Sequence, residues 1–427
     1  MTYRQTLDYL YAQLPMFSRI GEKAVKKDLF NTIQLCSLLD NPQHKFPSIH
    51  IAGTNGKGSV AHGLASIFRE AGFKTGLYTS PHLKDFRERI KINGQPCQEE
   101  FVTGFTEKMK PHIQTLHPSF FEVTVAMAFE YFAEQFVDMA IIETGLGGRL
   151  DSTNVITPQL SVITNISFDH QNILGNTKAE IAFEKAGIIK KGIPVVIGRK
   201  SEETNTVFVN KSLQEKAALY FAEDKVQIGK FSIDRNYLRL NYQLEGEDQT
   251  IHSDLRSIYQ VENIRTILAA VWAYNEFNPK KIGFPEIRNG LEKVIPSTHF
   301  NGRWQILQEN PRVIADVGHN EDGIRKMLAQ LRYEDFDQLH IIYGAVKDKD
   351  ISKILELLPK TARYYFTEPP LPRKLEVEEL MQQAETYGLN GEKYLYPKIA
   401  LESAIRQAKN NDLILISGSF FVVAEVI

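Results

Sequence analysis

The stretch from Ile49 to Ser59 constrains the fold of this chain more than any other part of the sequence. It begins with an apolar run rich in β-branched residues, which is typical of a buried strand, and passes through three glycines into a segment with helical spacing. A strand that turns through glycines into a helix aims backbone N–H groups and the positive helix end at one point. With Lys57 and the Ser59 hydroxyl beside it, this anion site suits a nucleotide phosphate and its Mg²⁺. The usual pattern has Ser or Thr directly after the Lys, where this chain has Gly58.

Length and composition limit the class of protein. The chain has 427 residues, which suggests about two or three domains, and 43% of them are hydrophobic, which is enough for a sizeable core. Its 50 Lys and Arg nearly balance 52 Asp and Glu, so nucleic-acid and membrane partners are not expected. No apolar run reaches the length of a membrane span, and Cys36 and Cys97 match no metal spacing. We therefore expect a cytoplasmic, monomeric enzyme.

Strand and helix patterns alternate along most of the chain. The buried-strand patterns of the first part lie at 49–52, 74–79, 137–143, 160–166 and 194–198. This alternation predicts an α/β fold with a doubly wound, mostly parallel sheet in a domain that spans 1–296. Short alternating segments predict a small antiparallel appendage over 201–257, within that domain. Four further strand patterns predict a second, smaller α/β domain over 297–427.

Polar residues follow several expected strands at the point where parallel strands bring their carboxyl ends together. Ser80 follows the second strand, Glu143 ends the third, and His170 comes shortly after the fourth. Ligands of open α/β sheets bind at this edge, so Glu143 is placed to reach the Mg²⁺ of a nucleotide. Ser80 and His170 are candidate metal ligands beside it, although a turn serine and a structural histidine are the alternative interpretations.

Several motifs occur together in an order typical of one family. They are Gly53–Ser59, Ser80–Leu83, Glu143 with Gly145–Asp151, Asp169–His170, Glu184–Gly187, Gly302–Trp304, Asp316–Asn320 and Ser417–Phe420. The chain resembles the bacterial folylpolyglutamate synthases of the type that are also dihydrofolate synthases. These belong to the Mur-ligase superfamily of ATP-dependent acid–amino acid ligases. The resemblance covers the chain except for 201–257 and some surface loops.

The resemblance implies amide formation in two steps. ATP phosphorylates the carboxylate of dihydropteroate or of a reduced folate, and the amine of L-glutamate then displaces phosphate, so that ADP and phosphate are released. Phosphorylation is needed because a carboxylate ion has a poor leaving group and repels a nucleophile. Water must be excluded while the acyl phosphate exists, which calls for a cleft between two domains.

The resemblance also implies roles for individual residues. Those expected to bind ATP are Asn55, Gly56, Lys57, Gly58, Ser59, Asn263, Arg303, Asp316 and His319. Those expected to act in catalysis are Lys57, Glu143, His170, Lys185 and Arg303. Two Mg²⁺ ions are expected, one bound by Ser80 and Glu143 and one by His170 and Glu143. Lys185 is expected to be carbamylated, which turns a cation into a carboxylate-like group, and Arg303 is expected to reach the γ-phosphate from the interdomain linker.

The substrate residues are likewise implied by resemblance. Phe121, Thr124 and Asp151 are expected near the pterin, with Met16-Phe17 as a further candidate, while a role in packing alone is the alternative for Phe121. Ser417 and Asp348 are expected to bind the incoming glutamate. The resemblance favours addition of both the first glutamate and later ones, and the residues alone leave open whether the chain has one activity or both.

Rival classes share parts of this pattern. A peptidoglycan Mur ligase has an additional N-terminal domain of ~100 residues for its UDP-sugar, and a phosphate loop that begins at Gly53 leaves no room for one. A P-loop kinase or GTPase lacks the Lys57–Ser59 spacing and the second α/β domain. A non-catalytic ATP-binding regulator is expected to have lost residues such as Lys57 or Glu143. A Mur-type ligase for a different carboxylate acceptor stays the main alternative. Gly318 and Glu321 replace the Ala and Pro that are commoner in relatives.

Overall fold

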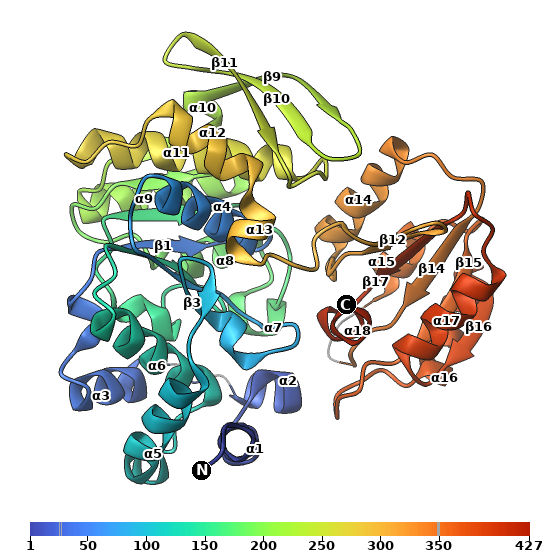
Figure 1. Ribbon diagram of the computed structural model, residues 1–427, viewed down its shortest axis with the longest axis horizontal. Helices are drawn as coiled ribbons and strands as arrows, with labels where there is room; N and C mark the ends of the chain where they lie inside the picture. The colour runs from blue at the N-terminus through green and yellow to red at the C-terminus, as the bar shows by residue number, and fades with distance from the viewer. Residues whose placement is uncertain (25, 27, 348–350) are drawn as a thin grey trace. The chain divides into compact units, whose positions relative to one another are not determined.

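The computed structural model describes residues 1–24, 26, 28–347 and 351–427 (Figure 1). The chain divides into two compact units. The first contains Met1–Phe17, Glu22–Arg256 and Gln260–His299; the second contains Ser18–Gly21, Ser257–Tyr259 and Phe300–Ile427. The division near residue 300 lies close to the domain boundary expected at 296/297, and two short segments earlier in the chain group with the second unit.

The first unit is built on a large sheet that is mostly parallel, as predicted. Within the described residues it has eight strands in the order β4-β3-β2-β5-β1-β6-β7-β8. Their bounds are β1 Ser48–Ala52, β2 Thr75–Tyr78, β3 Ile90–Ile92, β4 Gln95–Pro96, β5 Met139–Glu143, β6 Leu160–Ile163, β7 Val195–Ile197 and β8 Leu219–Phe221. Only the β3–β4 hairpin at one edge runs antiparallel, and its short strands left no clear pattern in the sequence.

Helices cover both faces of this sheet (Figure 1). Those of residues 1–299 are α1 Tyr3–Gln13, α2 Phe17–Ile20, α3 Phe30–Leu38, α4 Lys57–Glu70, α5 Glu99–Leu116, α6 Phe120–Glu134, α7 Gln171–Leu174, α8 Lys178–Ala186, α9 Glu202–Glu215, α10 Ala222–Lys225, α11 Gln260–Phe277, α12 Phe284–Glu292 and α13 Val294–Thr298. Helices α4, α11 and α12 pack together on one face, and α6 and α8 lie on the other. The structure is therefore the doubly wound arrangement that strand–helix alternation predicts.

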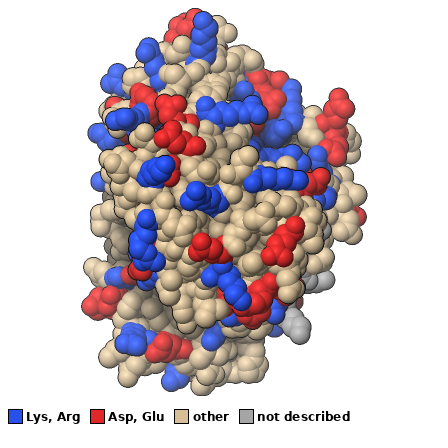
Figure 2. All heavy atoms as spheres, turned by 90° about the vertical axis from the view of Figure 1, so that its right-hand side faces the viewer, with Lys and Arg blue, Asp and Glu red and all other residues tan. Residues whose placement is uncertain are grey.

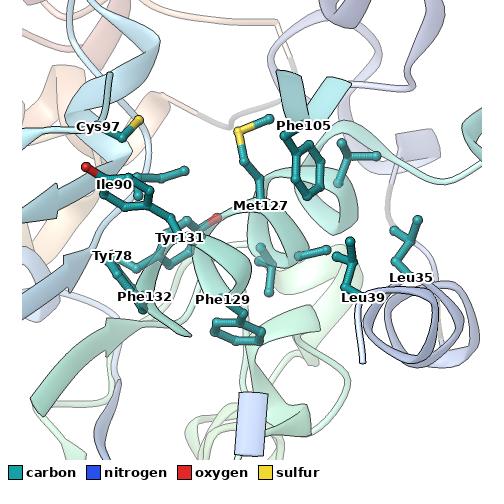
Figure 3. Close-up of a cluster of buried hydrophobic side chains, with 14 of the residues drawn as sticks. Leu35, Leu39, Tyr78, Ile90, Cys97, Phe105, Met127, Phe129, Tyr131 and Phe132 are labelled. Atoms are coloured by element: carbon teal, nitrogen blue, oxygen red, sulfur yellow. The ribbon is translucent and has the colours of Figure 1, made fainter. Parts of the chain in front are cut away.

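Helix α6 is buried on nearly all sides (Figure 3). Its sequence is apolar around the whole helix, so it can bury one side against the sheet and the other against α3 and α5. Phe129 and Phe132 each lie 5.8 Å from Phe46, measured between ring centroids. A capping box between Ser119 and Glu122 begins the helix and satisfies its free N–H groups. The apolar cluster thus fixes α6, whose Phe121 lies against Gly145 in the turn after Glu143.

The antiparallel appendage is shorter than the sequence indicated. Only β9 (Val226–Ile233), β10 (Leu238–Leu244) and β11 (Glu247–Ser253) form the separate antiparallel sheet. The preceding residues form α9, β8 and α10, and β8 pairs in parallel with β7 in the main sheet. Helix α9 was missed because it is largely polar and completely buries few side chains, among them Phe208, so its helical period is weak.

The second unit is the smaller α/β domain that was expected. Its described residues form a six-stranded sheet in the order β12-β13-β17-β14-β15-β16, parallel except for β12. The strands are β12 Gln305–Glu309, β13 Arg312–Ala315, β14 Leu339–Tyr343, β15 Arg363–Thr367, β16 Gly391–Tyr394 and β17 Leu413–Ser417. The helices are α14 Glu321–Gln330, α15 Ser352–Leu357, α16 Val377–Thr386, α17 Pro397–Gln407 and α18 Phe420–Val426. A core of its own, which includes Ile341 and Leu415, lies between the sheet and α14 to α16.

The surface carries no strong charge of one sign on the face shown in Figure 2, where acidic and basic side chains are interspersed. Among the residues that the structure describes, no helix is both long and apolar enough to cross a bilayer.

Candidate active site

The loop between β1 and α4 has a backbone that only glycine can adopt. Gly53 has a φ of 150° and Gly56 a φ of 83°. A Cβ atom at Gly53 would lie 1.9 Å from Thr164 Oγ1, and one at Gly56 would lie 2.2 Å from Asn263 Oδ1. Both distances are far below van der Waals contact, so the loop passes tightly between these side chains. The loop therefore has the strand–glycine–helix backbone from which the sequence predicted an anion site at the N-terminus of α4.

The segment after β6 holds this loop in place. The Thr164 hydroxyl donates to the Asn55 carbonyl at 2.6 Å, and the Asn55 N–H donates to Asn165 Oδ1 at 2.9 Å. Thr54 and Ser167 exchange two further bonds, each 3.1 Å long. Thr164, Asn165 and Ser167 were not among the residues expected from the sequence. Strand β6 neighbours β1 in the sheet, so its polar C-terminal residues were the signal that could have identified them.

Lys57 and Ser59 have the chemistry of a phosphate and metal site. Lys57 Nζ donates to the carbonyls of Gly53 and Thr54 at 3.1 and 3.3 Å. Ser59 is buried, and its hydroxyl has no hydrogen-bond partner among the described residues. A buried hydroxyl without a partner costs free energy unless a ligand satisfies it. The residues present thus fit a bound phosphate with its Mg²⁺.

Lys185 on α8 lies against the same loop. Its Nζ donates to the Gly53 carbonyl at 2.8 Å, and the residue is only 3% exposed. Burial, together with the positive charge of Lys57, lowers the pKa of Lys185 to about 7, although Asp169 and Asp151 oppose the shift. A substantial fraction of this amine is therefore neutral near pH 7, unlike that of a surface lysine.

Glu143 lies at the carboxyl end of β5, beside β1. It pairs in register with Ile51, which places it next to the phosphate loop, and it is buried. Its Oε2 accepts from the Ser80 N–H at 3.2 Å, so the structure brings two of the three expected metal ligands together. His170 is half-buried in a left-handed backbone conformation, with its ring edge-on to Phe17 at 5.4 Å. Within the described ranges, no three or more His, Cys, Asp or Glu side chains are arranged around one metal position.

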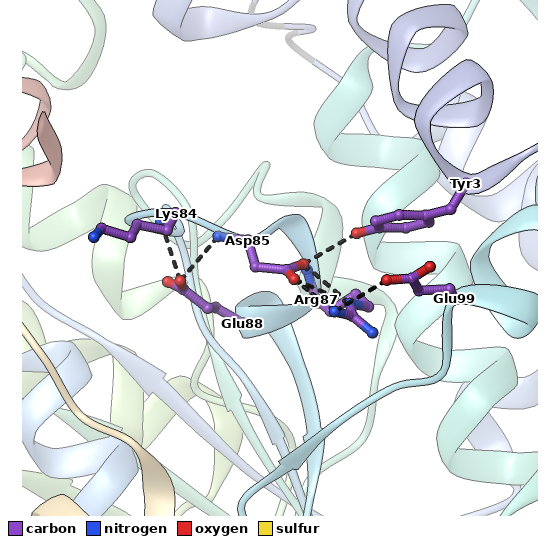
Figure 4. Close-up of polar contacts among 6 residues, drawn as sticks. All are labelled: Tyr3, Lys84, Asp85, Arg87, Glu88 and Glu99. Carbon is purple, nitrogen blue, oxygen red and sulfur yellow. Dashed lines mark hydrogen bonds and ion pairs between the residues drawn. The ribbon is translucent and has the colours of Figure 1, made fainter.

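A polar cluster fixes the segment that follows Ser80 (Figure 4). Tyr3 donates to Asp85 Oδ1 at 3.0 Å, and Arg87 bonds to Asp85 and to Glu99 of α5, at 2.7 and 3.3 Å respectively. The Glu88 carboxylate accepts three backbone N–H groups of residues 83 to 85. These bonds tie the segment to α1 and α5, so the Ser80 end of the loop is held from several sides.

Asn263 on α11 faces the phosphate loop. Its Nδ2 donates to Gln260 Oε1 at 2.7 Å, and its Oδ1 points at Gly56. The amide orientation is thus fixed by Gln260. The structure places this expected adenine-site residue directly beside the loop that is expected to hold the phosphates.

Two of the three expected pterin residues, Phe121 and Asp151, contact the turn after Glu143. The Phe121 ring lies against Gly145, where a Cβ would be 2.4 Å from Phe121 Cζ. Asp151 is buried, and its carboxylate accepts from the Leu146 N–H at 2.8 Å and the Thr153 hydroxyl at 2.5 Å. Thr124 donates its hydroxyl to the Phe120 carbonyl within α6 at 2.7 Å. Phe121 and Asp151 therefore shape the turn, while the Thr124 hydroxyl is engaged inside its helix.

The second unit gathers its own polar cluster at the carboxyl ends of β13 and β17. Asp316 accepts from the Tyr259 hydroxyl at 2.5 Å, the Trp304 N–H at 2.9 Å and the Gly318 N–H at 2.8 Å. Burial and the negative charge of Asp316 raise the pKa of Tyr259 well above its usual value. Ser417 donates to the Gly318 carbonyl at 3.1 Å. Tyr259 was not among the residues expected from the sequence.

The remaining expected residues of the second unit lie around this cluster. His319 Nδ1 is 3.0 Å from the Val317 carbonyl, and Arg303 Nη1 donates to the Gly302 carbonyl at 3.2 Å. Gly302 and Trp304, on either side of Arg303, have positive φ angles of 76° and 46°. Asp348 lies outside the described residues.

Known protein families match both units. Residues 51–273 match the Mur ligase middle domain, and residues 302–420 match the Mur ligase glutamate ligase domain. The dihydrofolate synthase/folylpolyglutamate synthase of Bacillus subtilis is 35% identical over 416 residues, which cover 94% of this chain and 94% of that protein. This chain belongs to the folylpolyglutamate synthase family of Mur ligases.

Solved structures of this family have the same fold. Escherichia coli FolC in complex with DHPP and ADP superposes with a TM-score of 0.88 at 27% identity, covering 100% of this chain and 97% of that one. The folylpolyglutamate synthase of Thermotoga maritima gives a TM-score of 0.82 at 32% identity, covering 99% and 95%. The family assignment makes the chain an ATP-dependent ligase and confirms the resemblance found in the sequence.

Proposed function

We propose that this ligase joins L-glutamate to dihydropteroate and to reduced folate (poly)glutamates through an acyl phosphate, with release of ADP and phosphate. The observation that carries the proposal is the meeting of the glycine loop, Glu143 and the buried amine of Lys185 at one sheet edge. A turn that only binds phosphate does not require a buried lysine such as Lys185 against the Gly53 carbonyl.

ATP binds in this proposal through the loop N–H groups and Lys57. In the structure, the Lys57 ammonium donates to two carbonyls of its own loop, at 3.1 and 3.3 Å. When ATP binds, charged phosphate oxygens would take the place of these neutral acceptors. Asn263 lies beside the loop for the base, and Arg303 contacts the γ-phosphate from the linker. Phosphoryl transfer depends mainly on such positioning and on offsetting charge.

Ser80 and Glu143, with Ser59, are the residues that would hold Mg²⁺, and His170 would serve a second ion. Oxygen ligands are what Mg²⁺ prefers, and the unpartnered Ser59 hydroxyl fits this use. Bound there, the metal would neutralise phosphate charge during transfer. Glu143 itself keeps the Ser80 backbone in place through the bond to its N–H.

We also propose that Lys185 is carbamylated. A carbamate forms when a neutral amine attacks carbon dioxide and releases a proton, and the pKa of about 7 makes the neutral amine available. The product is an anion, which would relieve the repulsion between Lys185 and Lys57 and give the site a further oxygen ligand.

Substrate positions are proposed from the same arrangement. Phe121 and Asp151 shape the turn next to Glu143 and are proposed to contact the pterin, and Thr124 is proposed to lie near it. In the second unit, Ser417 is proposed to bind glutamate near Asp316 and His319, which are proposed nucleotide contacts. Asp348 stays a proposed glutamate contact on resemblance alone.

The deciding experiment measures ADP release with ATP, Mg²⁺ and L-glutamate, and compares dihydropteroate with tetrahydrofolate as acceptor. Mass spectrometry of the products should show the gain of one glutamate on both acceptors. Gain on tetrahydrofolate alone would remove the dihydrofolate synthase activity from the proposal. No gain on either would favour a Mur-type ligase for a different carboxylate.

A further inference from the structure

Three side chains from outside α13 hold its C-terminal end. Lys91 Nζ on β3 donates to the carbonyls of Thr298 and His299 at 2.8 and 3.3 Å. From α4, Arg69 donates to the Ser297 carbonyl at 2.9 Å, and His62 Nδ1 lies 2.7 Å from the Thr298 hydroxyl. The last carbonyls of a helix have no partners within it, so these bonds satisfy groups that would otherwise need water.

Lys91 is the central member of this group, which we call the α13 anchor (His62, Arg69 and Lys91). The Lys91 residue is only 2% exposed, and burying an ammonium group is costly unless acceptors surround it. The chain approaches the same helix end closely at Gly94, where a Cβ would lie 1.9 Å from the Ser297 carbonyl oxygen. A charged side chain is therefore buried at this position with the two backbone carbonyls as hydrogen-bond acceptors.

The anchor connects the phosphate loop to the end of α13. His62 and Arg69 belong to α4, the helix whose N-terminus completes the phosphate loop. The same helix is bonded to α12 through Ser66, which donates to the Gly290 carbonyl at 2.7 Å. A Cβ at Gly290 would lie 2.6 Å from Ile67 Cα, so the two helix backbones are in close contact. The position of α4 thus determines the positions of α12 and α13, to which it is hydrogen-bonded.

The end of α13 is also where the chain leaves the first unit. His299 is its last residue, and only residues 300–302 separate it from Arg303. We propose that Lys91 is a positioning residue for Arg303, because it fixes the point from which this short linker departs. This inference rests on the proposed contact between Arg303 and the γ-phosphate, and it adds a residue that touches no substrate.

Kinetics of three variants test the proposal. Lys91→Met keeps the length of the side chain and removes the charge and the donors. It should lower kcat about tenfold or more, because small errors in the position of a catalytic group are costly, and leave the KM for ATP within about twofold. Lys91→Arg should recover most of the kcat. Lys74→Met is the matched control, because Lys74 also donates to a carbonyl at a helix end, that of Gln135 after α6.

The outcomes separate this inference from the proposed function. If Arg303→Ala leaves kcat unchanged, the role of Arg303 is wrong. If Arg303→Ala abolishes turnover while Lys91→Met has the same effect as Lys74→Met, the positioning role of Lys91 is overturned. ADP affinity and the circular dichroism spectrum of Lys91→Met should match those of the wild type, since the Lys91 side chain bonds to Thr298 and His299, away from the nucleotide loop, and the pairing of β3 with β2 and β4 is made by the backbone. If the ADP affinity or the spectrum differs from that of the wild type, a distance measurement between spin labels decides whether Lys91 has the positioning role.

A distance measurement tests the anchor without turnover. Spin labels on Glu100→Cys and Lys398→Cys, both exposed, report on the separation of the two units. Lys91→Met should broaden the distance distribution, and Lys91→Arg should not. Burial lowers the pKa of Lys91 to about 8, opposed by Glu88, and the other titratable residues at the same helix end are His62, Arg69 and His299. The wild-type distribution should therefore broaden from pH 7 to pH 9.5, and an unchanged distribution in Lys91→Met would overturn the proposal.

Discussion

At the scale of single residues, the phosphate loop depends on glycine for two separable reasons. Gly56 needs a positive φ of 83°, and a Cβ there would also collide with Asn263 at 2.2 Å. Gly72, which follows α4 and lies outside the loop, has a similar φ of 75°, but a Cβ there would have no heavy atom within 4 Å. Both glycines thus have a positive φ, but only Gly56 lacks room for a side chain.

We expect Gly56→Ala to weaken ADP binding by at least about tenfold, since both the loop and the Asn263 amide must move. Gly72→Ala should carry only the backbone cost of about 1 kcal/mol and leave ADP affinity unchanged. Calorimetric titration with ADP measures both. Equal losses of affinity in the two variants would show that the space around Gly56 is unimportant.

The proposed role of Glu143 as a Mg²⁺ ligand depends on its negative charge. Glu143→Gln keeps the acceptor for the Ser80 N–H but removes the negative charge. We expect ligation to be abolished with a native circular dichroism spectrum, because a neutral amide is a poor Mg²⁺ ligand. ADP release with either folate acceptor is the measurement. Full turnover in this variant would exclude Glu143 from the metal site.

Lys185 offers a test that does not need turnover. With ¹³C-labelled bicarbonate, the wild type should give a carbamate carbon signal that is missing from Lys185→Ala. The signal should increase as the pH rises through about 7, since the lowered pKa leaves more neutral amine above that value. Lys185→Ala should also lose activity, and short carboxylates should restore part of it. A signal of equal size in both proteins would assign it to another amine.

At the scale of elements, α8 matters because it presents Lys185 to the loop. Its N-terminus is a capping box in which Thr177 and Glu180 satisfy each other's backbone N–H groups. Thr177→Ala should cost about 1 kcal/mol and loosen the first turn, while Thr177→Ser should be close to neutral. Urea unfolding gives the free energy, and hydrogen exchange in α8 locates the effect. Loss of protection spread over other helices would argue against a local cap.

At the scale of the whole molecule, the two units have separate cores, and each buries a histidine whose pKa is lowered by burial. In the second unit, His340 is fully buried between the Tyr365 hydroxyl at 3.0 Å and Asp412 at 3.2 Å. Burial lowers the pKa of His340, although Asp412 opposes the shift. The unfolded chain, with a histidine pKa of about 6.5, therefore binds the proton more readily than the folded one. Stability of this unit should fall as the pH drops below about 6.5.

The two tryptophans allow this prediction to be checked unit by unit. Trp304 is in the second unit and Trp272 in the first, so a Trp272→Phe variant reports on the second unit alone. Its thermal unfolding by Trp304 fluorescence should move to lower temperature between pH 7 and pH 5. His340→Gln should flatten this dependence, because the amide does not titrate in that range. An identical slope in both proteins would assign the effect to other groups.

Much of the fold could be predicted because its signals are local. The phosphate loop is contiguous, and its strand, glycines and helix start lie within a few residues of one another. Strands β12 and β16 were missed because none of their residues is completely buried, so they lack the apolar run that marks a buried strand, and the β3–β4 hairpin has strands of only three and two residues. The extent of the antiparallel sheet was overestimated for a related reason, since polar α9 has a weak helical period.

The sequence by itself determined the order of strands and helices, the glycine loop and the family motifs, because each depends on neighbours along the chain. Only the tertiary structure decided which side chains lose water and what they meet. Lys185 reaches the Gly53 carbonyl across 132 residues, and Lys91 reaches Thr298 across 207. The pKa of each lysine is lowered by burial, and burial arises from segments that have no common pattern in the sequence. The active site of this ligase is therefore built from local sequence motifs, and packing between residues far apart in the sequence sets the burial and the pKa of their side chains.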